Sequence, residues 1–183
     1  MGGSGLLSLE SIAETVYALP MNSRNLVLSL FLLSLLTFFP GHASALDVQF
    51  LHIIDGDSLV VVSGGDSVEV RLIGVDAPEY RQEYSNKAKV FSLKFCHGKR
   101  LKLVFDREKK DRYGRTLAYV YADGEMLNKA IIQAGLALAF KIKPNTRYSS
   151  HFKAVEKEAK KAKRGFWRFG GLKQTPAQWR RAH

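Results

Sequence analysis

The chain of 183 residues is long enough for one domain of ordinary size with a processed or flexible end. Hydrophobic residues make up 46% of it and aromatic residues 11%, which excludes an intrinsically disordered chain. The formal net charge of +11 points to a polyanionic partner, either nucleic acid or an anionic membrane surface, although a lysine-rich surface alone gives the same charge.

The first 45 residues are predicted to be an N-terminal extension that contains a signal peptide. A positive region at Arg24 precedes an apolar run over residues 26–39, and the small-x-small sequence Ala43-Ser44-Ala45 follows. A membrane anchor is the alternative, but the run is shorter than the roughly 20 apolar residues of a spanning helix. We expect secretion, or export to a periplasm, with cleavage after Ala45.

From Leu46 onward the chain is predicted to form short strands joined by tight turns. Apolar and β-branched runs separated by Asp-Gly-Asp and Gly-Gly turn signatures are typical of hairpins. The strands are predicted at residues 50–54, 58–62, 67–75, 100–106 and 116–122. They are too closely spaced for βαβ crossovers, which argues against a parallel α/β sheet.

Three segments have the periodicity of helices. Apolar residues recur at helical spacing over residues 84–95, 126–134 and 149–163. From Phe166 onward the chain is aromatic and glycine-rich, and we expect an irregular C-terminal tail. The order of elements predicts an α+β protein, mainly β, with a five-stranded Greek-key barrel of the OB type and three helices, over residues 46–183. Such a barrel is a common platform for oligonucleotides, although the fold alone does not give the function.

Three polar segments lie at the ends of these strands. Asp55-Gly56-Asp57 separates the first two strands, residues 71–79 end the third, and residues 111–115 precede the fifth. A buried group of charges becomes favourable when a cation or an anionic ligand completes it. We therefore expect the three segments to form one site for a hard metal ion and a phosphate.

Oxygen ligands favour calcium as the metal. Asp57 and Asp76 offer carboxylates from adjacent strand ends, and the Ala77 carbonyl adds a neutral oxygen, a set that suits zinc or copper poorly. Cys96 is the only cysteine, and the histidines show no metal-ligand spacing, at positions 42, 52, 97, 151 and 183. Transition-metal chemistry is therefore not expected.

The remaining charged residues suggest hydrolysis of a phosphate ester. Glu79 would either ligate the ion or act as general base on a water held against it. Arg71 and Arg115 would bind phosphate oxygens as bidentate forks, and these bonds would strengthen as charge builds on the phosphorus.

The three polar segments resemble the signature segments of the thermonuclease, or staphylococcal nuclease, family. They are Ile-Asp-Gly-Asp-Ser at 54–58, Arg-Leu-Ile-Gly-Val-Asp-Ala-Pro-Glu at 71–79 and Asp-Arg-Tyr-Gly-Arg-Thr-Leu-Ala-Tyr-Val-Tyr at 111–121. Their joint order and spacing are specific, whereas any one of them alone is weak. The resemblance implies an OB-fold, calcium-dependent nuclease that cuts DNA and RNA at the 5′-oxygen and leaves 3′-phosphates.

The resemblance also implies a role for each matching residue. The implied metal ligands are Asp57, Asp76, Ala77 and, beside the ion, Glu79, which is also the implied base. The implied phosphate clamps are Arg71 and Arg115. The implied nucleotide contacts are Arg112, Tyr113 and Phe140, although a core or rim aromatic is an equal alternative for the last two. The expected partners are single-stranded or frayed DNA and RNA, bound by a monomer that does not associate stably with membranes after processing.

The sequence departs from the family pattern at three places. Ala77 stands where the best-known member has threonine, but the implied ligand is the backbone carbonyl. The loop between Glu79 and Tyr84 is several residues shorter and lacks a lysine-rich segment, which bears on substrate affinity and base preference. Phe140 stands where a tyrosine is familiar, so stacking is retained and a hydroxyl contact is lost.

Two other classes of protein are alternatives. A non-catalytic OB-fold nucleic-acid-binding module should lack one or more of Arg71, Glu79 and Arg115, yet all three are present. A membrane-surface protein needs a basic amphipathic helix with exposed large apolar residues. Residues 149–163 are basic, but their apolar stripe is needed for the core. The sequence therefore favours the nuclease.

Overall fold

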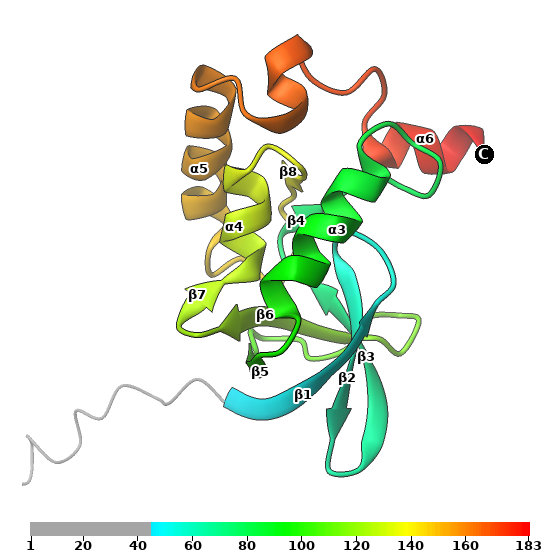
Figure 1. Cartoon of the computed structure of the whole chain (residues 1–183), viewed down its shortest axis with the longest axis vertical. Coiled ribbons are helices and arrows are strands. Elements are labelled where there is room, and N and C mark those ends of the chain that lie inside the picture. The colour runs from blue at the N-terminus through cyan, green and yellow to red at the C-terminus, as the bar shows by residue number, and fades with distance from the viewer. Residues whose placement is uncertain (1–44) are drawn as a thin grey trace, which may run out of the picture. The chain divides into compact units, whose positions relative to one another are not determined.

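The computed structural model describes residues 45–183 of the chain (Figure 1). The signal peptide predicted for the N-terminal extension lies outside the described residues, and only Ala45, the residue before the predicted cleavage point, is included. In this described part, no helix has both the length and the apolar character needed to cross a membrane.

Five strands close into a barrel, as Figure 1 shows. They are β1 (Ala45–Ile53), β2 (Ser58–Ser63), β3 (Asp66–Leu72), β5 (Arg100–Val104) and β6 (Thr116–Ala122). The order β3-β2-β1-β5-β6 is antiparallel throughout, and a parallel pairing of β3 with β6 closes the ring. The predicted five-stranded α+β barrel of the OB type is therefore confirmed.

The barrel interior is filled by alternate residues of its strands, as the period of two requires. Leu59 and Val61 of β2 are fully buried, and so is Val70 of β3. On β5, Leu101 and Leu103 point inward while the intervening Lys102 is exposed. This alternation fixes the register, and with it the strand ends at which the polar segments lie.

The third strand ends at Leu72, three residues before the predicted end. Gly74 adopts a φ of 77°, a conformation that costs glycine little, and a Cβ there would lie 2.8 Å from carbons of the Phe152 ring. After this bend the chain forms β4 (Val75–Asp76), which pairs with β8 (Leu138–Ala139). The bend separates Asp76 from the barrel strand that carries Arg71.

The three predicted helices are present. They are α3 (Ser85–Cys96), α4 (Leu127–Gln133) and α5 (Ser149–Lys161), and a short strand, β7 (Glu125–Met126), precedes α4. α3 packs against β1 and α4, and α4 packs against β6 and α5. Phe152 and Ala159 supply the buried face of α5, so its apolar stripe belongs to the core as expected.

The prediction of an irregular tail from Phe166 onward is wrong, and the count of three helices is therefore too low. Residues 45–183 contain a 3₁₀ helix, η1 (Gly165–Phe169), and a fourth α-helix, α6 (Pro176–Ala182). Thr175 and Gln178 cap α6 reciprocally, each side chain accepting the backbone N–H of the other, and Pro176 occupies the first helical position. The helix is too short to show an apolar period, so these capping residues were its only signal in the sequence.

Candidate functional site

A cleft of about 560 Å³ contains most of the predicted site residues. The predicted residues that line it are Asp57, Arg71, Glu79, Arg112, Tyr113, Arg115 and Phe140. The other two, Asp76 and Ala77, are buried at 3% exposure and do not line the cleft. Three segments that are far apart in the sequence therefore meet at one place.

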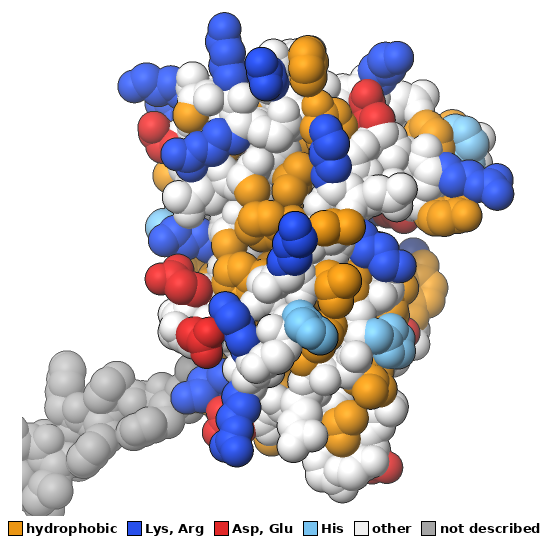
Figure 2. All heavy atoms as spheres, viewed as in Figure 1, with side chains coloured by type: hydrophobic (Ala, Val, Ile, Leu, Met, Phe, Trp, Pro, Cys, Tyr) orange, Lys and Arg blue, Asp and Glu red, His pale blue; other side chains and the backbone are white. Residues whose placement is uncertain are grey.

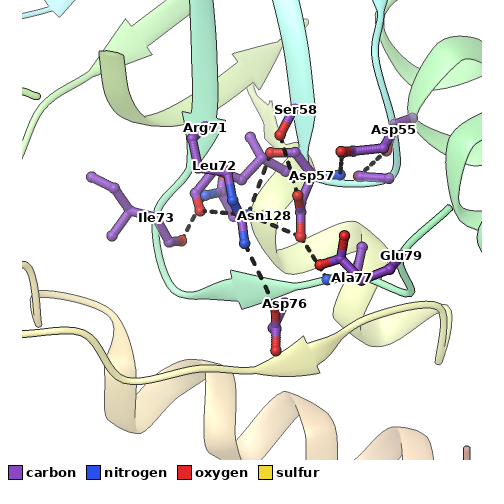
Figure 3. Close-up of polar contacts among 12 residues, drawn as sticks. Asp55, Asp57, Ser58, Arg71, Leu72, Ile73, Asp76, Ala77, Glu79 and Asn128 are labelled. Atoms are coloured by element: carbon purple, nitrogen blue, oxygen red, sulfur yellow. Dashed lines mark hydrogen bonds and ion pairs between the residues drawn. The ribbon is translucent and has the colours of Figure 1, made fainter. Parts of the chain in front are cut away.

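Asp57 ties the β1–β2 turn to the residues that follow β4. Its Oδ2 accepts the Ala77 N–H at 2.6 Å, and its carbonyl accepts the Leu72 N–H at 2.9 Å (Figure 3). The Asp57 N–H in turn donates to Asp55 Oδ1 at 2.9 Å, which shapes the Asp-Gly-Asp turn. The backbone of Asp57 is therefore fixed by two hydrogen bonds, and its carboxylate is held by the Ala77 N–H.

Arg71 lies between the two buried aspartates. Its Nη1 is 2.9 Å from Asp57 Oδ2, and its Nη2 is 3.7 Å from Asp76 Oδ1, as Figure 3 illustrates. Nη1 also donates to the Leu72 carbonyl at 3.3 Å. The guanidinium thus offsets part of the charge of both carboxylates.

The charge of Asp57 is only partly compensated. Burial raises the pKa of its carboxyl from the usual 3.8 to about 7, although the Arg71 guanidinium opposes the shift; nearby Asp55 adds to it and the Ala77 N–H lowers it. A buried carboxyl with a raised pKa is a group whose ionised form would gain from an additional cation.

This raised pKa predicts a pH-dependent stability. Between about pH 4 and pH 7 the folded protein binds more protons at Asp57 than the unfolded chain does, so its stability should fall as the pH rises through that window. Asp57→Asn removes the buried negative charge that Asp57 carries above about pH 7, and in chelator at pH 8 the variant should be more stable than the parent by about 1 kcal/mol, or roughly 4 °C in Tm.

Thermal unfolding of both proteins at pH 5 and pH 8 measures this effect. The advantage of the variant should shrink at pH 5, where Asp57 of the parent is protonated. Parallel pH profiles for the two proteins would contradict the assignment. Added calcium should stabilise the parent more than the variant, because ligand binding to the folded state raises its stability.

Glu79 is held at the edge of the cleft by its backbone. Its N–H donates to Gln82 Oε1 at 2.9 Å, and its carbonyl accepts the Gln82 N–H at 2.9 Å. The Glu79 side chain itself is 32% exposed. The backbone is therefore fixed while the carboxylate remains accessible from the cleft.

Arg115 is oriented by Asp111. Its Nε donates to Asp111 Oδ2 at 2.8 Å, and its backbone N–H donates to Asp111 Oδ1 at 3.0 Å. Burial of Asp111 acts to raise its pKa, but hydrogen bonds from the Arg115 side chain and from the Arg115 and Tyr113 backbone lower it below the ordinary value. From the sequence we assigned Asp111 to the polar segment 111–115 but did not predict that it orients Arg115.

Tyr113 and Phe140 lie at the rim of the cleft and not in the core, with exposures of 68% and 43%. The Arg112 guanidinium lies over the Tyr113 ring, 4.7 Å from its centroid. The Phe140 N–H donates to the Gly74 carbonyl at 3.0 Å, which ties the segment after β8 to the bend before β4. Both rings are accessible from the cleft.

Arg180 is a residue of the cleft that sequence reasoning missed. It lies on α6, and its Nη1 is 3.0 Å from Asp76 Oδ1 and also donates to Glu79 Oε1. It is separated from Asp76 by 104 positions in the chain, so no local spacing could have predicted the contact.

The residues present fit calcium in donor type and in charge. Within residues 45–183, no group of three or more His, Cys, Asp and Glu side chains is arranged to hold a metal ion. The three expected carboxylate ligands, those of Asp57, Asp76 and Glu79, are therefore not gathered around one point, but their oxygens and the Ala77 carbonyl are hard ligands of the kind that suits calcium. The two guanidinium groups of Arg71 and Arg180 face three carboxylates, which leaves net negative charge for a cation to offset.

Comparisons with known proteins relate this chain to nucleases. Residues 69–169 match the model of the family described as staphylococcal nuclease homologue. The thermonuclease of Staphylococcus hyicus is 35% identical over 133 residues, which cover 69% of this chain and 79% of that protein. The thermonuclease of Staphylococcus intermedius is 40% identical over 121 residues, or 63% and 72% of the two chains. Endonuclease YncB of Bacillus subtilis is 36% identical over 126 residues, or 64% and 60%.

Proposed function

This chain belongs to the staphylococcal nuclease family, and from that premise we propose that it is a calcium-dependent nuclease that hydrolyses DNA and RNA to 3′-phosphate products. The observation that carries the proposal is the cleft that Glu79 shares with Arg71 and Arg115, next to the buried Asp57 and Asp76. An accessible carboxylate, two arginine forks and hard oxygen ligands are the parts that metal-assisted phosphodiester hydrolysis needs.

In the proposed reaction, Arg71 and Arg115 bind the phosphate. Arg115 uses its Nε to bind Asp111, and its two terminal nitrogens donate no hydrogen bond to another residue of the described part of the chain. These nitrogens are therefore available to a phosphate in the cleft. Arg71 would exchange its contacts with Asp57 and Asp76 for phosphate oxygens once a cation offsets the two carboxylates.

Glu79 acts as the general base in the proposed reaction. It removes a proton from water, the water oxygen attacks the phosphorus, and the bond from phosphorus to the 5′-oxygen breaks. The leaving 5′-oxygen takes up a proton from solvent water and Glu79 returns its proton to solvent, so one fragment ends in a 5′-hydroxyl and the other in a 3′-phosphate. Arg71 and Arg115 stabilise the charge that builds on the other phosphate oxygens. Calcium, held by Asp57, Asp76 and the Ala77 carbonyl, would add charge stabilisation when bound.

The rim of the cleft supports binding of single-stranded substrate. Tyr113 and Phe140 offer exposed rings on which unstacked bases can lie, each worth roughly 1–3 kcal/mol in proteins that bind in this way. Arg112 adds positive charge beside Tyr113. Figure 2 shows Lys and Arg side chains spread over one face of the described protein, which favours attraction of a polyanion over long range.

Export is part of the proposal, because a calcium-dependent enzyme that is secreted can use the calcium outside the cell. Cleavage after Ala45 would shorten β1 by one residue and leave the pairing of Leu46 with Leu103 in place. N-terminal sequencing of the exported protein should begin at Leu46. A membrane-retained, full-length product would contradict the proposed processing and the release of a monomer.

Digestion of a single-stranded oligonucleotide tests the function. Purified protein should cleave it in calcium and not in chelator, and a phosphatase specific for 3′-phosphate should change the mobility of the products. Products with 5′-phosphate ends, or equal cleavage in chelator, would contradict the proposal. Tight binding without cleavage in calcium would instead support the non-catalytic OB-fold module.

A further inference from the structure

The C-terminal helix α6 brings a cation onto the carboxylates of the active site. Arg180 Nη1 lies 3.0 Å from Asp76 Oδ1, its Nη2 lies 3.5 Å from Asp76 Oδ2, and Nη1 also donates to Glu79. One guanidinium therefore bridges a proposed metal ligand and the proposed base. The closest atoms of Arg71 are farther from Asp76, at 3.7 Å, so Arg180 is the main cation at this carboxylate.

α6 is held in place by Arg180 and by two hydrogen bonds of the residues just before the helix. Gln82 Nε2 donates to the Gln174 carbonyl at 2.7 Å, and the Lys173 N–H donates to the Glu83 carboxylate. Within α6, only Pro176 is buried. An element with so few buried contacts can leave its position at low cost while the barrel stays folded.

Arg180 and calcium require the same oxygens. Calcium binds carboxylate oxygens at about 2.3–2.6 Å. Both oxygens of Asp76 are already approached by the Arg180 guanidinium, and two cations on one carboxylate repel each other. Glu79 is engaged by the same guanidinium, so it is not free to act as a base in this arrangement.

We propose that Arg180 is an internal cation that blocks the active site in the absence of calcium, and that calcium binding displaces Arg180 and releases α6. The inference rests on the proposed calcium-dependent function. Arg180 is then a positioning residue of the metal-free protein: it neutralises Asp76, holds Glu79 and lowers the apparent calcium affinity. The apparent dissociation constant equals the intrinsic one divided by the fraction of molecules in which Arg180 has left the site.

Calcium titration by calorimetry tests the displacement. Arg180→Gln removes the competing charge, and it should bind calcium roughly 3- to 10-fold more tightly than the parent, the range expected if the pairs that are broken contribute about 1 kcal/mol. Arg181→Gln is the matched control, because it removes the same charge from the same helix, and within residues 45–183 the side chain of Arg181 hydrogen-bonds only to the Ala177 carbonyl of α6 itself. Arg180→Lys keeps the cation and should restore an affinity within about 2-fold of the parent.

Hydrogen exchange gives a second readout that does not depend on activity. Addition of calcium chloride to the parent should speed exchange of the α6 amides and leave the amides of α5 unchanged. Equal calcium affinity of Arg180→Gln and Arg181→Gln, or α6 amides whose exchange calcium does not affect, would overturn the proposed role of Arg180 and leave the calcium-dependent function standing. Absence of calcium binding in the parent and in Arg180→Gln would overturn the calcium-dependent function and this inference with it.

Discussion

Glu79→Gln should lower the turnover of oligonucleotide cleavage by roughly 100-fold or more, while oligonucleotide affinity changes little. Glutamine keeps the size and hydrogen-bonding capacity of the side chain but cannot accept the proton of the attacking water. The backbone at this position is fixed by two hydrogen bonds with Gln82, neither of which uses the Glu79 side chain. The loss should therefore appear in the chemical step and not in the fold.

Single-turnover kinetics in saturating calcium separate this step from substrate binding and product release. Glu83→Gln is a suitable control, because Glu83 belongs to the same loop and carries the same charge, while its carboxylate accepts the Lys173 N–H and does not line the cleft. This control should cleave within about 3-fold of the parent rate. If Glu79→Gln cleaves as fast as the parent, the proposed mechanism is wrong, whatever the metal dependence.

The barrel was predictable because its signals are local. Alternation along each strand and a turn signature between strands give the order of elements, and that order limits the architecture to a closed antiparallel sheet. The positions of Asp57 and Arg115 follow from it, since each lies in a turn beside a strand end. The bend at Gly74 was not predicted, because Ile73 and Val75 continue the apolar pattern through a glycine that only tertiary packing against Phe152 shows to be bent.

The features of the site that escaped prediction depend on contacts between distant segments. The pairing of Arg180 with Asp76 requires the path of the chain after Gly165, and no periodicity describes it. The orientation of Arg115 by Asp111 is different, since the two residues are four positions apart and the hydrogen bonds close a short turn. An Asp followed by Arg-Tyr-Gly-Arg in a loop was a readable signal for that contact.

Arg115→Lys should also lower turnover strongly, by roughly 100-fold, although it keeps the positive charge. In the structure one edge of the guanidinium is bound by Asp111, through Nε at 2.8 Å, and the terminal nitrogens remain for a phosphate. Lysine has one nitrogen for both tasks. Its ammonium group would pair with the Asp111 carboxylate, so the phosphate would lose its contact and the charge developing in the transition state would lose its partner.

Arg112→Lys is the matched control for this substitution. Arg112 lines the same cleft, but its guanidinium lies over the exposed Tyr113 ring and is not held by a carboxylate. The change should weaken oligonucleotide binding modestly, within about 5-fold, and leave the chemical step almost unchanged. Asp111→Asn should reproduce part of the loss seen in Arg115→Lys, because a neutral amide holds the guanidinium less firmly. A parent-like turnover for Arg115→Lys would mean that charge alone suffices at this position and that the planar fork held by Asp111 has no part in catalysis.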